Sequence, residues 1–149
     1  MRIRLTLLAF AALFASLSTA AEPEIVSNVK IWDQGKHNAF TDLIRWKDQW
    51  YCTFREADAH IGGDGVIRVL TSKDGNTWTS IAGITEKGID LRDPKFSLTP
   101  DDRLMIVAGG SIYEGRVLKG RQPRVMFSKD GSNWTAPSRP TMADDLVSS

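Results

Sequence analysis

The 149-residue chain has one cysteine, a formal net charge of only +1 and no pattern of a long amphipathic helix. The single cysteine, Cys52, excludes an internal disulfide, and its place in an alternating pattern typical of a strand predicts a buried, unreactive thiol. The small net charge offers no electrostatic field for nucleic-acid binding. Metal-ligand spacings, phosphate-binding loops and dinucleotide fingerprints are also absent from the sequence, so we expect neither a metal nor a cofactor.

Long apolar runs are absent except near the start of the chain. Residues 1–20 combine a basic start at Arg2 and Arg4, an apolar run from Leu5 to Leu17 and small residues up to Ala20. This order predicts a secretory signal peptide, and the run is too short to span a bilayer comfortably. We expect a secreted or periplasmic protein with no membrane partner after cleavage. A retained membrane anchor is the alternative.

One short motif occurs twice in the chain. Residues 72–78 read Ser-Lys-Asp-Gly-Asn-Thr-Trp, and residues 128–134 read Ser-Lys-Asp-Gly-Ser-Asn-Trp. Asp-Gly between alternating apolar runs predicts a hairpin turn, because glycine accepts positive φ and the aspartate bonds its own turn backbone. We expect the serine hydroxyl and the carboxylate to accept the N–H groups of the turn, and the indole to cover the underside of the hairpin.

Patterns typical of strands surround both copies of the motif. They predict strands at 25–32, 39–46, 49–55, 66–71, 78–84, 96–99, 104–108 and 124–127, with a Gly-rich loop before the last of these. The motif recurs after 56 residues, and the strand that begins at Trp50 has its counterpart at Leu104, 54 residues later. A whole four-stranded unit therefore repeats, which is typical of β-propeller blades.

The repeated motif resembles the Asp-box of the sialidase (BNR-repeat) β-propellers, in a short form and with Asn133 where threonine is usual. The resemblance implies an all-β, incomplete propeller over 21–149, with two four-stranded blades at about 37–84 and about 91–140. Because propellers close with about four to eight blades, we expect the N-terminal portion of a longer protein. A ring assembled from several chains is the alternative. The resemblance also implies that Asp74 and Asp130 are structural, on turns opposite the ligand-binding mouth.

The loop after the second strand of blade one holds the first candidate site. Sialidases carry their acid/base aspartate in this loop, so the resemblance implies that Asp58, or less well Asp64, donates a proton to the leaving glycosidic oxygen. His60 would hold this acid or touch the substrate. Glu56 would help to raise the pKa of the acid. A solvated loop with ordinary turn residues is the alternative.

Arg92 and Asp93, just before a strand of blade two, form the second candidate site. Their place matches the sialidase site where an arginine helps to clamp the carboxylate of the substrate, since a guanidinium binds a planar anion through two hydrogen bonds. Arg92, Asp93 and the following proline also resemble a motif of five-bladed glycosidase propellers, whose aspartate steadies an oxocarbenium-like transition state. A structural ion pair between the two residues is the alternative.

Blade one departs from the sialidase pattern at the equivalent place. Residues 37–40 read His-Asn-Ala-Phe where the first clamp arginine is usual, so Arg55 would have to substitute. His37 and Asn38 form a weaker substrate-binding set with Asp42, for which a structural role is the alternative. Basic residues between 113 and 124 would attract an acidic sugar, or would simply be solvated.

These features predict an exported sialidase-like glycoside hydrolase acting on glycans, acidic ones included. Asp58 is the predicted acid, and Arg92 and Arg55 are the predicted recognition groups. The nucleophile of sialidases would lie in later blades. Two alternatives stay open: a non-catalytic Asp-box propeller that binds glycans or proteins, and an inactive truncated fragment.

Overall fold

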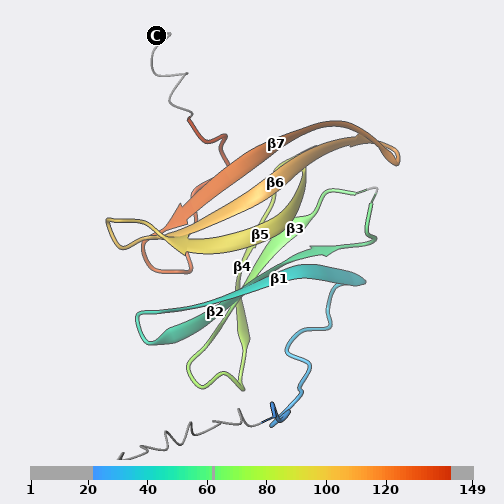
Figure 1. Ribbon diagram of the computed structural model, residues 1–149. Coiled ribbons are helices and arrows are strands. Elements are labelled where there is room, and N and C mark those ends of the chain that lie inside the picture. Colours follow the sequence, from blue (N-terminus) through green and yellow to red (C-terminus); the bar gives the residue numbers. More distant parts are fainter. Residues whose placement is uncertain (1–21, 62, 142–149) are drawn as a thin grey trace, which may run out of the picture.

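The computed structural model describes residues 22–61 and 63–141, and in these ranges the chain consists of β-strands and connecting segments (Figure 1). No helix is found there, and hence none that is long and apolar enough to cross a membrane. The predicted signal peptide at 1–20 lies outside the described residues. The strands are β1 (His37–Trp46), β2 (Gln49–Ala57), β3 (Val66–Ser72), β4 (Thr79–Ile84), β5 (Asp90–Leu98), β6 (Leu104–Glu114) and β7 (Val117–Ser128).

The strands form two antiparallel sheets. The first has the strand order β1-β2-β3-β4 and the second the order β5-β6-β7. Figure 1 shows the second sheet above the first, with β5 nearest to the first sheet. The prediction of an all-β chain is confirmed for the described residues. A closed propeller would need more than these two sheets and stays a prediction.

The main hydrophobic core lies between the two sheets. Successive side chains of a strand point to opposite faces, so each sheet can turn one apolar face toward the other. The first sheet contributes Trp46, Tyr51, Ile67, Val69 and Ile84. The second sheet contributes Leu91, Leu104, Ile106, Ala108 and Met126, together with Ile89, which lies just before β5. Each fully buried aliphatic side chain contributes about 1.5–3 kcal/mol. This packing fixes β2 and β5 against each other.

A smaller cluster lies on the outer face of the first sheet. Cys52 and Phe54 of β2 are buried there together with Leu70 of β3. The partly buried side chains that cover them are Ile31, Trp32 and Trp78. The predicted burial of Cys52 is confirmed. Burial, and to a lesser degree the Asp42 carboxylate, raise the pKa of its thiol to about 11, so the thiol is protonated at neutral pH.

The predicted strand at 25–32 is wrong. Residues 22–33 form no strand, and Ile25 and Val26 are exposed. Ile31 and Trp32 pack on the outer face of the first sheet. A segment that lies across the face of a sheet covers it with side chains, and its backbone finds no ladder partner there.

The prediction of a Gly-rich loop before residue 124 is also wrong. Instead, β6 and β7 form a long hairpin, in which Leu104 pairs with Ser128 at one end and Glu114 pairs with Val117 at the other. Glycine at 110 permits this pairing, since a Cβ there would lie 2.8 Å from the Gln122 carbonyl oxygen. Arg124 was predicted either to be solvated in this loop or to attract an acidic sugar. In the structure its side chain is buried and donates two hydrogen bonds to Glu86, at 2.6 and 2.9 Å.

The second sheet has three strands, where four were predicted. In residues 135–141 the backbone hydrogen bonds to β7 are an isolated bridge between Val125 and Ser138 and one bond from Thr135. Pro137 interrupts this segment. A proline has no N–H to donate to a ladder, which disfavours a regular fourth strand.

The first Asp-box turn forms as predicted. Asp74 Oδ1 accepts hydrogen bonds from the backbone N–H groups of Asn76 and Thr77, both at 2.8 Å. Ser72 Oγ accepts the N–H of Gly75 at 2.9 Å. These donors stabilise the ionised carboxylate and lower the pKa of Asp74 to about 2.

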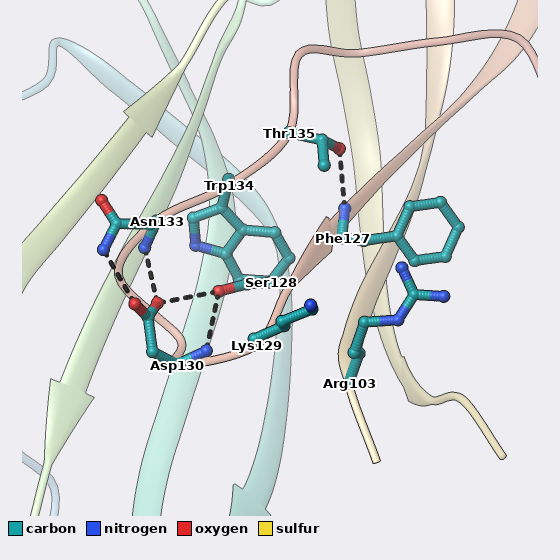
Figure 2. Close-up of a pocket in the computed structure, with 8 residues that line it drawn as sticks. All are labelled: Arg103, Phe127, Ser128, Lys129, Asp130, Asn133, Trp134 and Thr135. Carbon is teal, nitrogen blue, oxygen red and sulfur yellow. Dashed lines mark hydrogen bonds between the residues drawn. The ribbon is translucent and has the colours of Figure 1, made fainter. Parts of the chain in front are cut away.

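The second turn repeats this arrangement (Figure 2). Ser128 Oγ accepts the N–H of Gly131 at 2.8 Å, and Asp130 Oδ1 accepts two backbone N–H groups. The Trp78 and Trp134 indoles each donate to the glycine carbonyl of their own turn at 2.9 Å. Both turn glycines have positive φ, which is why the motif needs glycine.

Candidate functional site

The two Asp-box turns lie at one end of the sheets, and a cluster of buried charges lies at the other. Trp50 pairs with Ser72 at the Asp-box end of β2, whereas Glu56 pairs with Val66 at the opposite end. In Figure 1 this opposite end, with the loop between β2 and β3 and the tip of the β6–β7 hairpin, is toward the right. The end of β2, the start of β5 and the loop between β2 and β3 build the candidate site.

Arg55 and Asp90 form the centre of the site. The Arg55 side chain is 0% exposed and the Asp90 side chain 2%. Arg55 Nε donates to Asp90 Oδ1 at 2.7 Å, and Arg55 Nη1 donates to the Ala59 carbonyl at 3.0 Å. Arg55 Nη2 is buried and has no hydrogen-bond partner among the described residues. Because desolvating an ion costs several kcal/mol, such a pair is stable only when its partners are held in place.

Arg92 joins this pair from β5. Its Nη1 donates to the second oxygen of Asp90 at 3.0 Å and to the His60 carbonyl at 2.8 Å. The guanidinium carbon lies 5.2 Å from the centre of the Phe40 ring. Two arginines and one aspartate leave one positive charge uncompensated within the cluster. An anion that reaches Arg92 is therefore favoured.

Matching β-bulges shape β1 and β5 beside the cluster. The pairing register slips once in each of these strands. Each slip contains a residue with positive φ, Phe40 at 64° and Asp93 at 49°. A bulge re-aims nearby side chains, and positive φ costs a bulky residue on the order of 1–3 kcal/mol. The matching positions make Ala39 the counterpart of Arg92, so β1 offers no arginine at this place.

Gly65 lets the loop between β2 and β3 rejoin the sheet next to the cluster. A Cβ at this position would lie 2.5 Å from the Leu91 carbonyl oxygen and 2.7 Å from Arg55 Nε, and would press on Asp90 Oδ1. Only glycine fits such a close backbone approach. The loop that carries the predicted acid is thus anchored at its end on the Arg55–Asp90 pair.

The predicted carboxylates surround the cluster and are not gathered in it. Asp58 is exposed and lies 3.1 Å from Lys36 Nζ. Asp64 is exposed and accepts the backbone N–H of Gly88 at 2.8 Å. Asp93 is exposed on the β5 bulge. None of these three carboxylates has a hydrogen bond to Arg55 or Arg92 in the described part of the chain.

Glu56 is bound on the other face of β2. It accepts a hydrogen bond from Arg68 Nη2 at 2.6 Å and one from the indole N–H of Trp32. Neighbouring residues of a strand point to opposite faces, so Glu56 and Arg55 diverge. In this arrangement Glu56 holds the segment before β1 against the first sheet.

The two histidines lie together at the rim of the site. The His60 ring centre is 5.3 Å from that of His37 and 5.7 Å from that of Phe40. His60 Nε2 lies 3.4 Å from Arg92 Nη2. The Asn38 amide donates at 3.0 Å to the backbone carbonyl three residues earlier. His37, His60 and Arg92 therefore share one location, whereas Asn38 is engaged within its own turn.

Asp90 and Phe40 are parts of the site that sequence reasoning missed. The sequence could have indicated Asp90, because it lies two residues before Arg92 in one strand and its side chain therefore projects to the same face of the sheet. A carboxylate at that place could have been assigned to both arginines. Phe40 had no such signal, because the direction of its ring depends on the bulge in β1.

A hollow of about 200 Å³ opens beside Asp90. Its other walls include Asp64 and, from the tip of the β6–β7 hairpin, Tyr113 and Gly115. Within residues 22–61 and 63–141, no cluster of three or more His, Cys, Asp or Glu side chains could hold a metal ion. The hollow is lined by the carboxylates of Asp64 and Asp90, whereas Arg92 and the two histidines lie outside its lining.

Comparison with known proteins gives a likeness of fold. No family model matches the sequence, and no curated protein matches it. A structure of a protein of unknown function from Dyadobacter fermentans is similar with a TM-score of 0.63 and 22% identity, over 78% of this chain and 40% of that chain. A "putative glycoside hydrolase" from Parabacteroides distasonis is similar with a TM-score of 0.54 and 17% identity, over 69% of this chain and 32% of that chain.

Both similar proteins are much longer than the aligned part. The match covers 40% and 32% of their lengths. At these identities the likeness concerns the fold and leaves the chemistry open. The chain thus shares the fold of a part of two longer proteins, one of which is described as a "putative glycoside hydrolase".

Proposed function

We propose that the chain is part of an exported, sialidase-like β-propeller glycosidase that acts on acidic glycans. The observation that carries this proposal is the Arg55–Asp90–Arg92 cluster beside His60, at the end of the sheets opposite both Asp-box turns. The two Asp-box motifs and the fold likeness to the Parabacteroides protein support the same class.

Arg92 is the recognition group of this proposal. Its side chain is 8% exposed, so a small movement of the His60 rim would open it to the carboxylate of a sugar. Arg55 is fully buried and acts through Asp90, which fixes the direction of the Arg92 guanidinium. Arg55 and Asp90 are therefore positioning residues, and Arg92 touches the substrate.

Asp58 is the proposed proton donor. Its carboxylate is exposed, and the loop that carries it is tied to the cluster through the Ala59 and His60 carbonyls. A glycan seated on Arg92 would cover this loop and exclude water from Asp58. Proton donation to the leaving oxygen then follows the general-acid route of glycosidases.

The test is hydrolysis of a chromogenic sialoside by the full-length protein. We expect Asp58→Asn to lower kcat by about 10²–10⁴-fold and Arg92→Ala to raise KM. Matched controls are Asp33→Asn and Arg45→Ala, which change exposed residues outside the site. Unchanged activity in both site variants would overturn the assignment.

Recognition without cleavage is the second candidate function. It is favoured by the Asp58 carboxylate, which is 86% exposed and already paired with Lys36. A glycan array distinguishes the two candidates. Retention of acidic glycans without turnover supports a binding protein, and release of free sugar supports the enzyme.

A further inference from the structure

A second hollow, of about 400 Å³, lies beside the second Asp-box turn (Figure 2). The side chains that matter for its chemistry are Arg103, Phe127, Lys129, Asp130, Trp134 and Thr135. This is the end of the sheets opposite Arg92, because Ser128 pairs with Leu104 at one end of β6 and Arg121 pairs with Ser111 toward the other. The hollow is thus separate from the site described above.

Two aromatic side chains form its apolar walls. The Trp134 indole is fixed by its hydrogen bond to the Gly131 carbonyl at 2.9 Å and by the Phe96 ring, 6.3 Å away between ring centres. The guanidinium carbon of Arg103 lies 4.7 Å from the centre of the Phe127 ring. Both rings are partly exposed. Rigid, partly exposed aromatic faces are typical of ligand sites.

Lys129 supplies a positive charge to this hollow. No hydrogen bond or ion pair of its ammonium group is found among the described residues, and the side chain is exposed. Arg103 is compensated by Asp101, whose Oδ2 lies 2.7 Å from Arg103 Nε. Thr135 Oγ accepts the N–H of Phe127 at 3.0 Å and keeps its own hydroxyl proton to donate.

Asp130 also lines the hollow, but among the described residues its carboxylate forms no ion pair with Lys129. Its carboxylate accepts hydrogen bonds from the Ser132 and Asn133 N–H groups, the Asn133 amide and the Ser128 hydroxyl. These donors, led by the two groups of Asn133, hold the pKa of Asp130 well below its usual range. The carboxylate is therefore committed to its own turn.

The first Asp-box turn lacks this combination. Lys73 holds the same place in the motif as Lys129. The hollow of about 350 Å³ beside it is lined by Gln49, Thr71, Thr79 and residues of the turn, with no aromatic side chain. Trp134 is the tryptophan of the motif and has Trp78 as its counterpart, so the difference between the two hollows lies in Phe127, which has Thr71 at the equivalent place of the first copy.

We propose that the hollow at the second Asp-box turn binds a negatively charged carbohydrate. The apolar face of a sugar ring packs on Trp134, its carboxylate pairs with Lys129, and a ring hydroxyl accepts the Thr135 proton. This site needs no catalytic group. It stands whether or not the Arg92 site cleaves glycans.

The test is a titration of the full-length protein with α-1,4-linked digalacturonic acid, followed by NMR of the indole N–H groups. We expect the Trp134 signal to shift while the Trp78 signal, from the equivalent indole of the first turn, stays in place. Neutral α-1,4-linked galactobiose should bind more weakly. Lys129→Ala should weaken binding of the acid by about tenfold or more, and the matched Lys73→Ala should leave it unchanged.

Three results would overturn the proposal. Equal effects of Lys73→Ala and Lys129→Ala would mean that only surface charge attracts the ligand. Inorganic phosphate that shifts Trp134 as strongly at the same concentration would mean an anion site without sugar recognition. An unshifted Trp134 signal would mean no site. Lys129 is exposed, so its variant should fold, and an unchanged thermal melt confirms this.

Discussion

At one end of the two sheets a carboxylate is buried and held by arginines, whereas at the other end carboxylates are exposed and held by backbone N–H groups. Asp90 is 2% exposed and is bound by Arg55 and Arg92. Asp74 and Asp130 are exposed and are bound by their own turns. The same residue type therefore has two roles in one short chain.

The comparison shows what each arrangement can do. A turn that satisfies its carboxylate from its own backbone is complete in itself, and it can occur in proteins of any function. The Arg55–Asp90–Arg92 cluster joins two sheets and a loop and leaves one positive charge over. Only this second arrangement carries a net charge that a bound anion would compensate.

The largest expected effect is that of Asp90→Asn. The amide keeps the shape of the side chain but leaves two buried guanidinium groups without their counter-ion. We expect a loss of about 3–5 kcal/mol in the free energy of unfolding, measured by urea denaturation. The control is Asp33→Asn on the surface. A loss no larger than that of Asp74→Asn would break the contrast between the two ends.

Gly65→Ala should have the next largest effect. The added methyl group would meet the Leu91 carbonyl oxygen, Arg55 Nε and Asp90 Oδ1, so the sheet must shift at a cost of about 1–3 kcal/mol. Gly63→Ala is the matched control in the same loop, because nothing lies within 4 Å of its added Cβ. Equal unfolding midpoints for the two variants would show that the loop does not depend on the cluster.

Asp74→Asn should have a smaller effect that depends on pH. The pKa of Asp74 is lowered from 3.8 to about 2 by its backbone donors. The charged turn therefore stabilises the fold above about pH 4, and this contribution disappears as the pH falls toward 2. The melting temperatures of the variant and the natural protein should differ at pH 7 and converge near pH 2. A difference that persists at pH 2 would contradict this account of the turn.

Asn133→Thr should have the smallest effect. Both side chains reach the second oxygen of the turn aspartate, Asn133 Nδ2 to Asp130 at 2.8 Å and Thr77 Oγ1 to Asp74 at 3.4 Å. The two turns are therefore equivalent in their internal bonding, and thermal melts of the variant and the natural protein should agree. A marked fall would mean that the second turn relies on its amide.

The fold was predicted correctly where the alternation of apolar and polar residues and the residues of the turns indicate the same strands. β1 to β4 appear within a few residues of their predicted positions, because the Asp-Gly turn fixes the register between β3 and β4. The long β6–β7 hairpin was missed because its glycines and charges are typical of loops. Its pairing depends on close backbone contact that a sequence pattern does not display. The segment at 25–32 was misassigned because apolar residues that cover a sheet resemble those within one.

The candidate site was predicted in part. Arg55, Arg92, His37 and His60 were chosen for one mouth, and the structure brings them to one end of the sheets. Asp90 was missed although Arg92 lies two residues away in the same strand, because its other partner, Arg55, comes from β2 and is 35 residues distant in the sequence. The role of Asp58 stays a prediction, since its carboxylate points to solvent and to Lys36.

An NMR titration of the arginine Nε–H signals with sialyllactose tests the proposal that the Arg92 end recognises acidic glycans. We expect the Arg92 signal to shift and saturate, while the signal of the exposed Arg45 on the first sheet does not respond. Neutral lactose should leave both signals in place. If sialyllactose left the Arg92 signal in place, or shifted it no more than the Arg45 signal, the Arg92 end would not be a glycan site.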